Sequence, residues 1–363
     1  MRKVKKMIAL ALTIALCTAL LAGCVGSGNV SANANSGAAN VSSGSENAPQ
    51  KDPIVIRIGG TVSDTHPVTI TEYKFKELFE AATNGAYEVQ VYTNCALGSP
   101  LEMLEAVQLG NLEMCDSGNM VVAPYTKMLT FMDIPYIFSS REVALQFVDS
   151  EVAQGLYDRM AAECGIRPLL PMDLGYMTLS NNVREIHKPE DLKGIKFRVQ
   201  DTPMYIKYFE TLGGSPTPMA LNEVFTAAQQ GTIDGITTQN AVFNSQRFYE
   251  VIEYVSDMNP YYCTCYLYTS EKWYQSLPDD VREIFLQCVK EATEYGREVA
   301  HEYIEKIDKE LETACTVTHL TDEERAAFVE GSAFMIDYFK ESVGDPYLDE
   351  YLAEIAKIEA SLS

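Results

Sequence analysis

Residues 191–200 read DLKGIKFRVQ, and this short stretch sets the pattern for much of the chain. From residue 195 onward, isoleucine, phenylalanine and valine alternate with lysine, arginine and glutamine. Such alternation is typical of a strand with one buried face and one polar face, and it places Arg198 on the polar face. The stretch therefore predicts a β-strand over 195–200. It leaves two interpretations of Arg198 open, a solvated edge residue or a functional cation.

Helix and strand patterns alternate on both sides of this strand. After it we expect helices over 202–212 and 222–230, and strands over 216–219 and 232–237. Before it, strand patterns lie at 54–60, 87–92 and 113–117, helix patterns at 69–83, 100–109 and 141–164, and strand pieces follow from 167. This order predicts an α/β fold.

One helix in the last third of the chain is expected to be very long. The Tyr-rich stretch 259–270 alternates like a long strand, and the Leu-Pro-Asp-Asp sequence at 277–280 resembles a helix start. The helix pattern that follows runs over about 281–315, which corresponds to about 50 Å at the rise of an α-helix. A helix of this length could span two lobes. Helices over 321–341 and about 346–361 are expected to end the chain.

The N-terminal residues have the composition of an export signal. A basic start, MRKVKK, precedes an apolar run that is too short for a stable membrane span. Cys24 follows Leu-Ala-Gly, which resembles the bacterial lipobox, so we expect a lipoprotein signal peptide over 1–23 and a lipid on Cys24. An ordinary secretory signal with a chance cysteine is the alternative. Residues 24–53 contain almost no large apolar side chains and are expected to be a disordered tether.

These features predict an extracytoplasmic location, on the periplasmic or outer-surface side of a bacterial cell membrane, with the lipid as anchor. Removal of the signal leaves 24 basic and 51 acidic side chains, a net charge of about −27. Such a charge argues against nucleic acid and anionic lipid surfaces as partners. The positive contacts to any anionic ligand must therefore be local.

Cysteine usage does not indicate a disulfide framework. Seven cysteines remain after the signal and Cys24, an odd number, and no CxxC motif occurs. Packing as small hydrophobic side chains is favoured over disulfides or a metal site. The seven are Cys95, Cys115, Cys164, Cys263, Cys265, Cys288 and Cys315.

Motifs of enzymes, metal sites and cofactor sites are missing from the sequence. There is no GxSxG, HExxH, Walker loop or GxGxxG. His187, His301 and His319 lack the spacing of metal ligands. His66 differs because it follows the first strand, where ligands of α/β proteins bind, although a structural role is equally consistent with its position. We expect no catalytic residue, no metal and no cofactor.

Several sequence blocks together resemble one family, the solute-binding proteins of TRAP (tripartite ATP-independent periplasmic) transporters. The blocks occur in order over about 54–300 and read IGGTVSDTHPV, CALGSPLEMLEAVQLGNLEM, MDIPYIFSS, HKPEDLKGIKFRVQ, LGGSPTPMALNEVFTAAQQGTIDGITT and FYEVIEYVS. The resemblance implies a two-lobe, periplasmic-binding-protein-like fold with a hinge and a long helix bridging both lobes. Lobe I would comprise 54–174 and about 264–303, and lobe II 175–263 and about 304–363.

The resemblance also implies the function. Most ligands of the family are small organic acids, held by an arginine in the block that reads DLKGIKFR here, and that residue is Arg198. A guanidinium suits this role because its planar fork holds a carboxylate through two parallel hydrogen bonds. The protein would then deliver the ligand to a permease driven by an ion gradient, without catalysis.

Two departures from the family pattern narrow the expected ligand. The family often has a second arginine where this chain has Met177, which favours a monocarboxylate. An asparagine that often follows the family's Asp-Gly is replaced by Thr238, and Asn240 two residues later is a candidate substitute.

Further ligand-contact candidates follow from position alone, and for each a core or loop role is equally consistent. They are His66, Glu72, Tyr73, Asn119, Met177 and Phe225. Two other functions remain open at this point. One is a ligand-presenting sensor subunit, and the other is a secreted hydrolase or lyase on a similar bilobal fold, with His66, Glu72 or Asp201 as its base.

Overall fold

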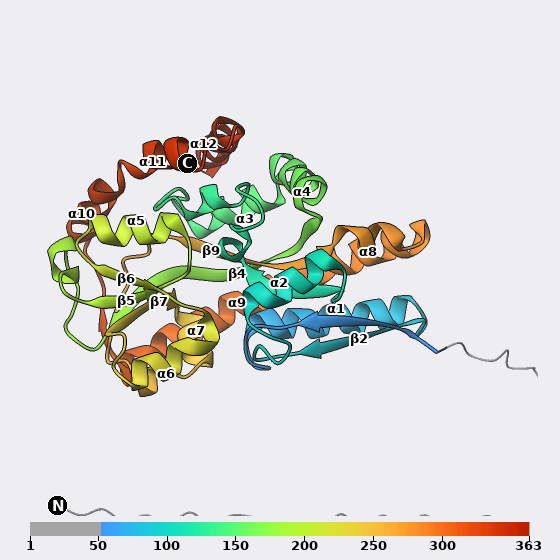
Figure 1. The fold of residues 1–363 in the computed structure, drawn as a ribbon, viewed down its shortest axis with the longest axis horizontal. Helices are drawn as coiled ribbons and strands as arrows, with labels where there is room; N and C mark the ends of the chain where they lie inside the picture. The colour runs from blue at the N-terminus through green and yellow to red at the C-terminus, as the bar shows by residue number, and fades with distance from the viewer. Residues whose placement is uncertain (1–51, 363) are drawn as a thin grey trace, which may run out of the picture. The chain divides into compact units, whose positions relative to one another are not determined.

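The computed structural model describes residues 52–362 (Figure 1). The predicted signal peptide, Cys24 and the tether up to residue 51 lie outside the described residues. Among the described helices, none combines the length and the apolar composition that crossing a membrane requires.

The strands are β1 (Ile54–Gly59), β2 (Tyr87–Tyr92), β3 (Met114–Gly118), β4 (Ile166–Asn181), β5 (Lys196–Val199), β6 (Ser215–Pro218), β7 (Gly235–Gln239), β8 (Tyr254–Ser256), β9 (Tyr262–Ser270) and β10 (Thr316–Thr318). The α-helices are α1 (Pro67–Ala82), α2 (Pro100–Leu109), α3 (Arg141–Asp149), α4 (Glu151–Cys164), α5 (Pro203–Thr211), α6 (Val224–Gln229), α7 (Asn240–Ser245), α8 (Glu271–Ser276), α9 (Asp279–Ala314), α10 (Asp322–Ser332), α11 (Met335–Ser342) and α12 (Leu348–Leu362). Short 3₁₀ helices include η1 (Asn119–Val122), η2 (Thr130–Asp133) and η4 (Leu221–Glu223).

Within residues 52–362, ten strands form one mixed sheet. Its main order is β2-β1-β3-β9-β4-β7-β5-β6, and β8 joins β4 to β10. The pairs of β1 with β2 and β3 are parallel, as are those of β5 with β6 and β7. The predicted α/β class is therefore confirmed. We use lobe I for the part built on β1, β2 and β3, and lobe II for the part built on β5, β6, β7 and β8.

Two long strands in the middle of the sheet connect the lobes. The first part of β4 pairs with β9, which also pairs with β3 of lobe I. From Met177 to Asn181, β4 pairs with β7 of lobe II instead. Register shifts interrupt the β4–β9 ladder on both sides of Met172 and Asp173, and irregularities of this kind are typical of β-bulges.

The long helix α9 contacts elements of both lobes, as the sequence predicts. It packs against α1 and β4 and, further along, against α7 and β10 (Figure 1). The crossing with α1 is close because residue 296 has no side chain. A Cβ atom on Gly296 would lie 2.0 Å from Oγ1 of Thr71.

Three expectations about elements are corrected. The single helix expected over 141–164 is two helices, because Ser150 adopts an extended backbone and its hydroxyl caps α4 at the amide of Ala153. The strand pieces after 167 are one strand, β4. The helix expected over 321–341 is α10 followed by α11.

The C-terminal helix α12 packs against α3 and α4. The ring of Tyr351 on α12 lies 4.6 Å from that of Phe131, centroid to centroid. α12 therefore contacts helices within 141–164, a range that the sequence analysis expects in lobe I.

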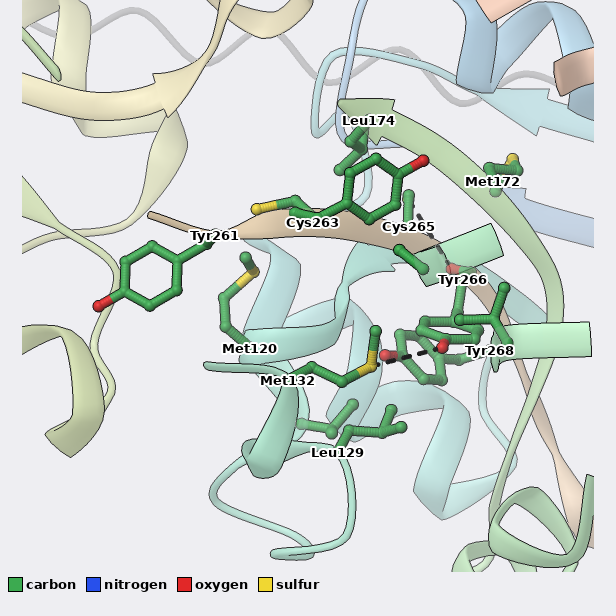
Figure 2. Close-up of a cluster of buried hydrophobic side chains, with 14 of the residues drawn as sticks. Met120, Leu129, Met132, Met172, Leu174, Tyr261, Cys263, Cys265, Tyr266 and Tyr268 are labelled. Atoms are coloured by element: carbon green, nitrogen blue, oxygen red, sulfur yellow. Dashed lines mark hydrogen bonds between the residues drawn. The ribbon is translucent and has the colours of Figure 1, made fainter. Parts of the chain in front are cut away.

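Tyrosine, methionine and cysteine side chains surround β9 in the core (Figure 2). Cys263 and Cys265 are buried there, and the Tyr266 hydroxyl donates to the Met132 sulfur at 3.7 Å. All seven cysteines of the described part are unpaired. Cys115, Cys263, Cys265 and Cys288 are buried, whereas Cys95, Cys164 and Cys315 are partly exposed.

Candidate functional site

A cavity of about 400 Å³ lies where the parallel strands of both lobes end. Lobe I contributes the segments after β1 and β3 and the start of α2, and lobe II the segments after β5, β6 and β7. The central strands contribute Leu174 and Cys265. In α/β proteins this position, beyond the carboxyl ends of the strands, is where ligands bind. The cavity is therefore the candidate ligand site.

Arg198 near the end of β5 lines this cavity and is only 4% exposed. Its Nε donates to the Met219 carbonyl at 2.9 Å, and Nη1 donates to the Thr237 carbonyl at 3.3 Å. These two bonds fix the plane of the guanidinium. Within residues 52–362, no carboxylate forms an ion pair with Arg198.

The electrostatic state of Arg198 follows from this burial. Loss of hydration lowers the pKa of the Arg198 guanidinium to about 10, so it stays charged at neutral pH. A buried charge without a counter-ion is costly, and an anion that enters the cavity would relieve that cost. The geometry therefore suits the carboxylate of a ligand.

The comparisons with known proteins agree with this architecture. The family described as bacterial extracellular solute-binding protein, family 7 (DctP), matches residues 58–342. The C4-dicarboxylate-binding periplasmic protein DctP of Rhodobacter capsulatus is 31% identical over 296 residues, 81% of this chain and 88% of the relative. This chain belongs to that family. The TRAP solute-binding family inferred from the sequence blocks is thereby confirmed.

Solved structures of family members show the same two-lobe fold. A sugar acid binding protein from Advenella mimigardefordensis, in complex with galactonate, superimposes with a TM-score of 0.81 at 25% identity. The alignment covers 85% of this chain and 100% of that one. A TRAP periplasmic solute-binding protein from Shewanella oneidensis with bound succinate gives a TM-score of 0.79 at 26% identity, covering 84% and 99%.

Thr238 is the second predicted site residue that lines the cavity of this solute-binding protein. Thr238 follows Thr237, whose carbonyl accepts from Arg198. The end of β7 therefore places Thr238 close to Arg198. The Thr238 hydroxyl donates to Oε1 of Gln239, which also lines the cavity, at 3.4 Å.

Asn240, the predicted substitute for the family's asparagine, does not line this cavity. It begins α7, and its Nδ2 donates to Oδ1 of Asp308 on α9 at 2.8 Å. Its Oδ1 accepts from the Thr178 hydroxyl at 3.0 Å. Asn240 therefore ties β4 to α9 beside a second, smaller cavity of about 290 Å³.

Met177 and Phe225 are also not among the residues that line the cavity. Met177 pairs with Gln239 in the β4–β7 ladder but is completely buried. Phe225 packs on Phe248, with ring centroids 6.5 Å apart. Residue 177, where the family often has a second arginine, is therefore not exposed to the cavity in this structure.

The predicted residues around α1, His66, Glu72 and Tyr73, do not line the cavity. His66 caps α1 by accepting from the Val68 amide at 3.2 Å, and it is buried. Burial lowers the pKa of His66 to about 3, so it is neutral. Tyr73 is 40% exposed, and Lys74 beside it lies over the Tyr295 ring.

Asn119, the remaining candidate, is buried and does not line the cavity. Its Nδ2 donates to Oδ1 of Asp133 at 3.0 Å, and its Oδ1 accepts from the Thr264 amide at 3.4 Å. It therefore links the loop after β3 to η2 and β9 and has a structural role here.

Glu72 faces a second buried carboxyl group, Asp116, instead of the cavity. Burial, and after it the charge of Asp116, raise the pKa of Glu72 well above its usual range. Asp116 accepts from both the amide, at 2.9 Å, and the hydroxyl of Thr61. Since Thr61 lines the cavity, Asp116 fixes the orientation of one cavity residue.

Four lining residues with charged or amide side chains were not predicted as ligand contacts. They are Gln200, Asp201, Glu223 and Gln239. Three of them could have been predicted from their positions at the carboxyl ends of strands. Gln200 and Asp201 stand at the end of the predicted strand 195–200, and Gln239 follows the predicted strand 232–237. Glu223 could not, because it lies in η4, which sequence patterning does not separate from α6.

Proposed function

We infer that this protein captures a small organic acid in the cavity between the lobes and delivers it to the membrane permease of a TRAP transporter. The observation that carries this inference is the buried guanidinium of Arg198, which lines the cavity and has no carboxylate partner in residues 52–362. Relatives are named for binding C4-dicarboxylates and 2,3-diketo-L-gulonate, which are also organic acids.

The ligand that we propose has a single carboxylate. Arg198 is the one basic side chain among the described residues that line the cavity, whereas Asp201 and Glu223 are acidic. A second ligand carboxylate would therefore be desolvated without a cation and would be repelled by these two side chains. The cavity also has many apolar lining residues, including Val62, Val68, Met120, Leu174, Leu221 and Val242.

The lobes and the anchor complete the proposal. We place 54–174 and about 264–303 in lobe I, and 175–263 and about 304–347 in lobe II, and we assign α12 to lobe I because it packs on α3 and α4. A lipid on Cys24, with residues 24–53 as a tether, would hold the protein at the extracytoplasmic face of the membrane. The protein acts by binding and release, without catalysis.

The test is a calorimetric and thermal-shift screen of monocarboxylates, dicarboxylates and sugar acids, with Arg198→Ala as the decisive variant. Truncating one partner of a buried, hydrogen-bonded charge pair costs about 2–5 kcal/mol, which corresponds to a loss of affinity of about 30- to 4000-fold. Arg184→Ala is the control, because Arg184 contacts the Asp191 carbonyl outside the cavity. Undiminished affinity in a folded Arg198→Ala variant would contradict the proposal.

A further inference from the structure

The ligand cavity contains more negative than positive charge. Asp201 comes two residues after β5, and Glu223 lies in η4, which follows β6. Both are exposed and line the cavity together with Arg198. Neither forms an ion pair with a basic side chain of residues 52–362. The site thus presents one unpaired cation and two unpaired anions.

The charges of opposite sign lie on neighbouring segments of lobe II. Arg198 and Asp201 are three residues apart at the end of β5. Met219, whose carbonyl accepts from Arg198 Nε, belongs to the same segment after β6 as Glu223. A ligand carboxylate on Arg198 would neutralise one charge only. The two carboxylates would remain and would attract a positive group elsewhere on the same ligand.

One residue of the opposite wall, Thr61, also favours hydrogen-bond donors on the ligand. The amide and the hydroxyl of Thr61 both donate to Asp116. Because a hydroxyl has one hydrogen, Thr61 Oγ1 has only lone pairs left to offer the cavity. Apart from Arg198, the charged lining groups and Thr61 are therefore acceptors, and they suit a ligand with N–H donors.

We propose that the ligand is a zwitterion, an amino carboxylate whose carboxylate binds Arg198 and whose protonated nitrogen faces Asp201 and Glu223. The proposal rests on the function inferred above and narrows its ligand class. The apolar lining residues of lobe I and of β4 would receive the hydrocarbon part of the ligand.

The experiment compares ligands that differ at one position only. Leucine, 2-hydroxy-4-methylpentanoate and 4-methyl-2-oxopentanoate share a carboxylate and an isobutyl group, and phenylalanine and alanine form equivalent sets with their hydroxy and oxo acids. The other common amino acids, 4-aminobutanoate and glycine betaine complete the panel. Calorimetry of the wild-type protein should show that the best amino carboxylate binds at least tenfold more tightly than its hydroxy and oxo counterparts.

Neutral variants separate the charge effect from shape. In the double variant Asp201→Asn/Glu223→Gln, affinity for the amino carboxylate should fall at least tenfold, whereas affinity for the hydroxy and oxo acids should stay or rise. Glu210→Gln is the matched control, because Glu210 is exposed on α5 and does not line the cavity. That variant should bind every ligand like the wild type.

The possible outcomes distinguish this proposal from the function on which it rests. If hydroxy or oxo acids bind more tightly than every amino carboxylate, and Arg198→Ala abolishes that binding, the function stands and the zwitterion proposal is wrong. If no amino carboxylate binds, or if the double variant binds the amino carboxylate as the wild type does, the proposal is also wrong. If Arg198→Ala changes nothing, the inferred function itself fails.

Discussion

Replacing Asp133 by asparagine should change how the stability of this protein depends on pH. Asp133 ends η2 and is fully buried beside Asn119, whose Nδ2 donates to its Oδ1 at 3.0 Å. Its other oxygen, Oδ2, has no hydrogen-bond partner in the described part of the chain. Burial raises the pKa of Asp133 to about 8 from its ordinary value of 3.8. At neutral pH the folded protein therefore keeps this carboxyl protonated.

The sign and size of the effect follow from proton linkage. Below about pH 4 the carboxyl is protonated in both the folded and the unfolded chain. Between about pH 4 and the folded pKa of about 8, only the folded chain keeps the proton, so the free energy of unfolding decreases as pH rises. At about 1.4 kcal/mol per pH unit, the loss reaches on the order of 5 kcal/mol by pH 8. Asparagine resembles the protonated carboxyl in shape and does not ionise, so the variant avoids this loss.

Urea denaturation of the wild type and of Asp133→Asn at pH 5, 6, 7 and 8 measures the effect directly. The stability advantage of the variant should grow by about 4 kcal/mol across this range. Asp337→Asn is the control, because Asp337 is exposed on α11, and its difference from the wild type should stay small at every pH. A difference between Asp133→Asn and wild type that does not vary with pH would refute the reasoning.

Two further variants test the fold and the ligand site. Met177→Arg places a guanidinium without a partner at a completely buried position. We expect the free energy of unfolding in urea to fall by several kcal/mol and the affinity for succinate not to rise. If calorimetry showed that this variant binds succinate, residue 177 would reach the ligand. Gly296→Ala adds a Cβ that meets Oγ1 of Thr71, so the stability should fall by about 1–3 kcal/mol, and a second change, Thr71→Ala, should restore part of the loss. An undiminished midpoint of thermal unfolding in Gly296→Ala would mean that α1 and α9 can move apart without any loss of stability.

The sequence predicted the alternation of elements because strands such as β2 (YEVQVY) and helices such as α1 have apolar residues at a regular spacing. It did not predict the break at Ser150, since the apolar period continues from α3 into α4 and only the backbone at one residue differs. It also could not place α12, because packing on α3 and α4 depends on contacts across some 200 residues of chain.

Within the candidate site, the sequence pattern did not predict the directions of several side chains. Alternation placed Arg198 on a polar face and suggested solvent, but the guanidinium is buried, and it donates to the Met219 and Thr237 carbonyls on the segments beside β5. The direction of Met177 depends on the register of β4 with β7, which no local pattern encodes. Asn240 and Glu72 were expected near the ligand, yet the Asn240 amide donates to the exposed carboxylate of Asp308, and Glu72 lies beside the buried carboxyl group of Asp116.

The position of β9 in the sheet also determines the order in which the protein can fold. β9 lies between β3 and β4, although β3 precedes it by more than 140 residues along the chain. During synthesis, the edges of β3 and of the first part of β4 that pair with β9 therefore stay unpaired until β9 has been made. Exposed strand edges of this kind promote aggregation. Lobe I, although it begins first, can be completed only late, and a chain truncated before residue 262 would lack the centre of its sheet.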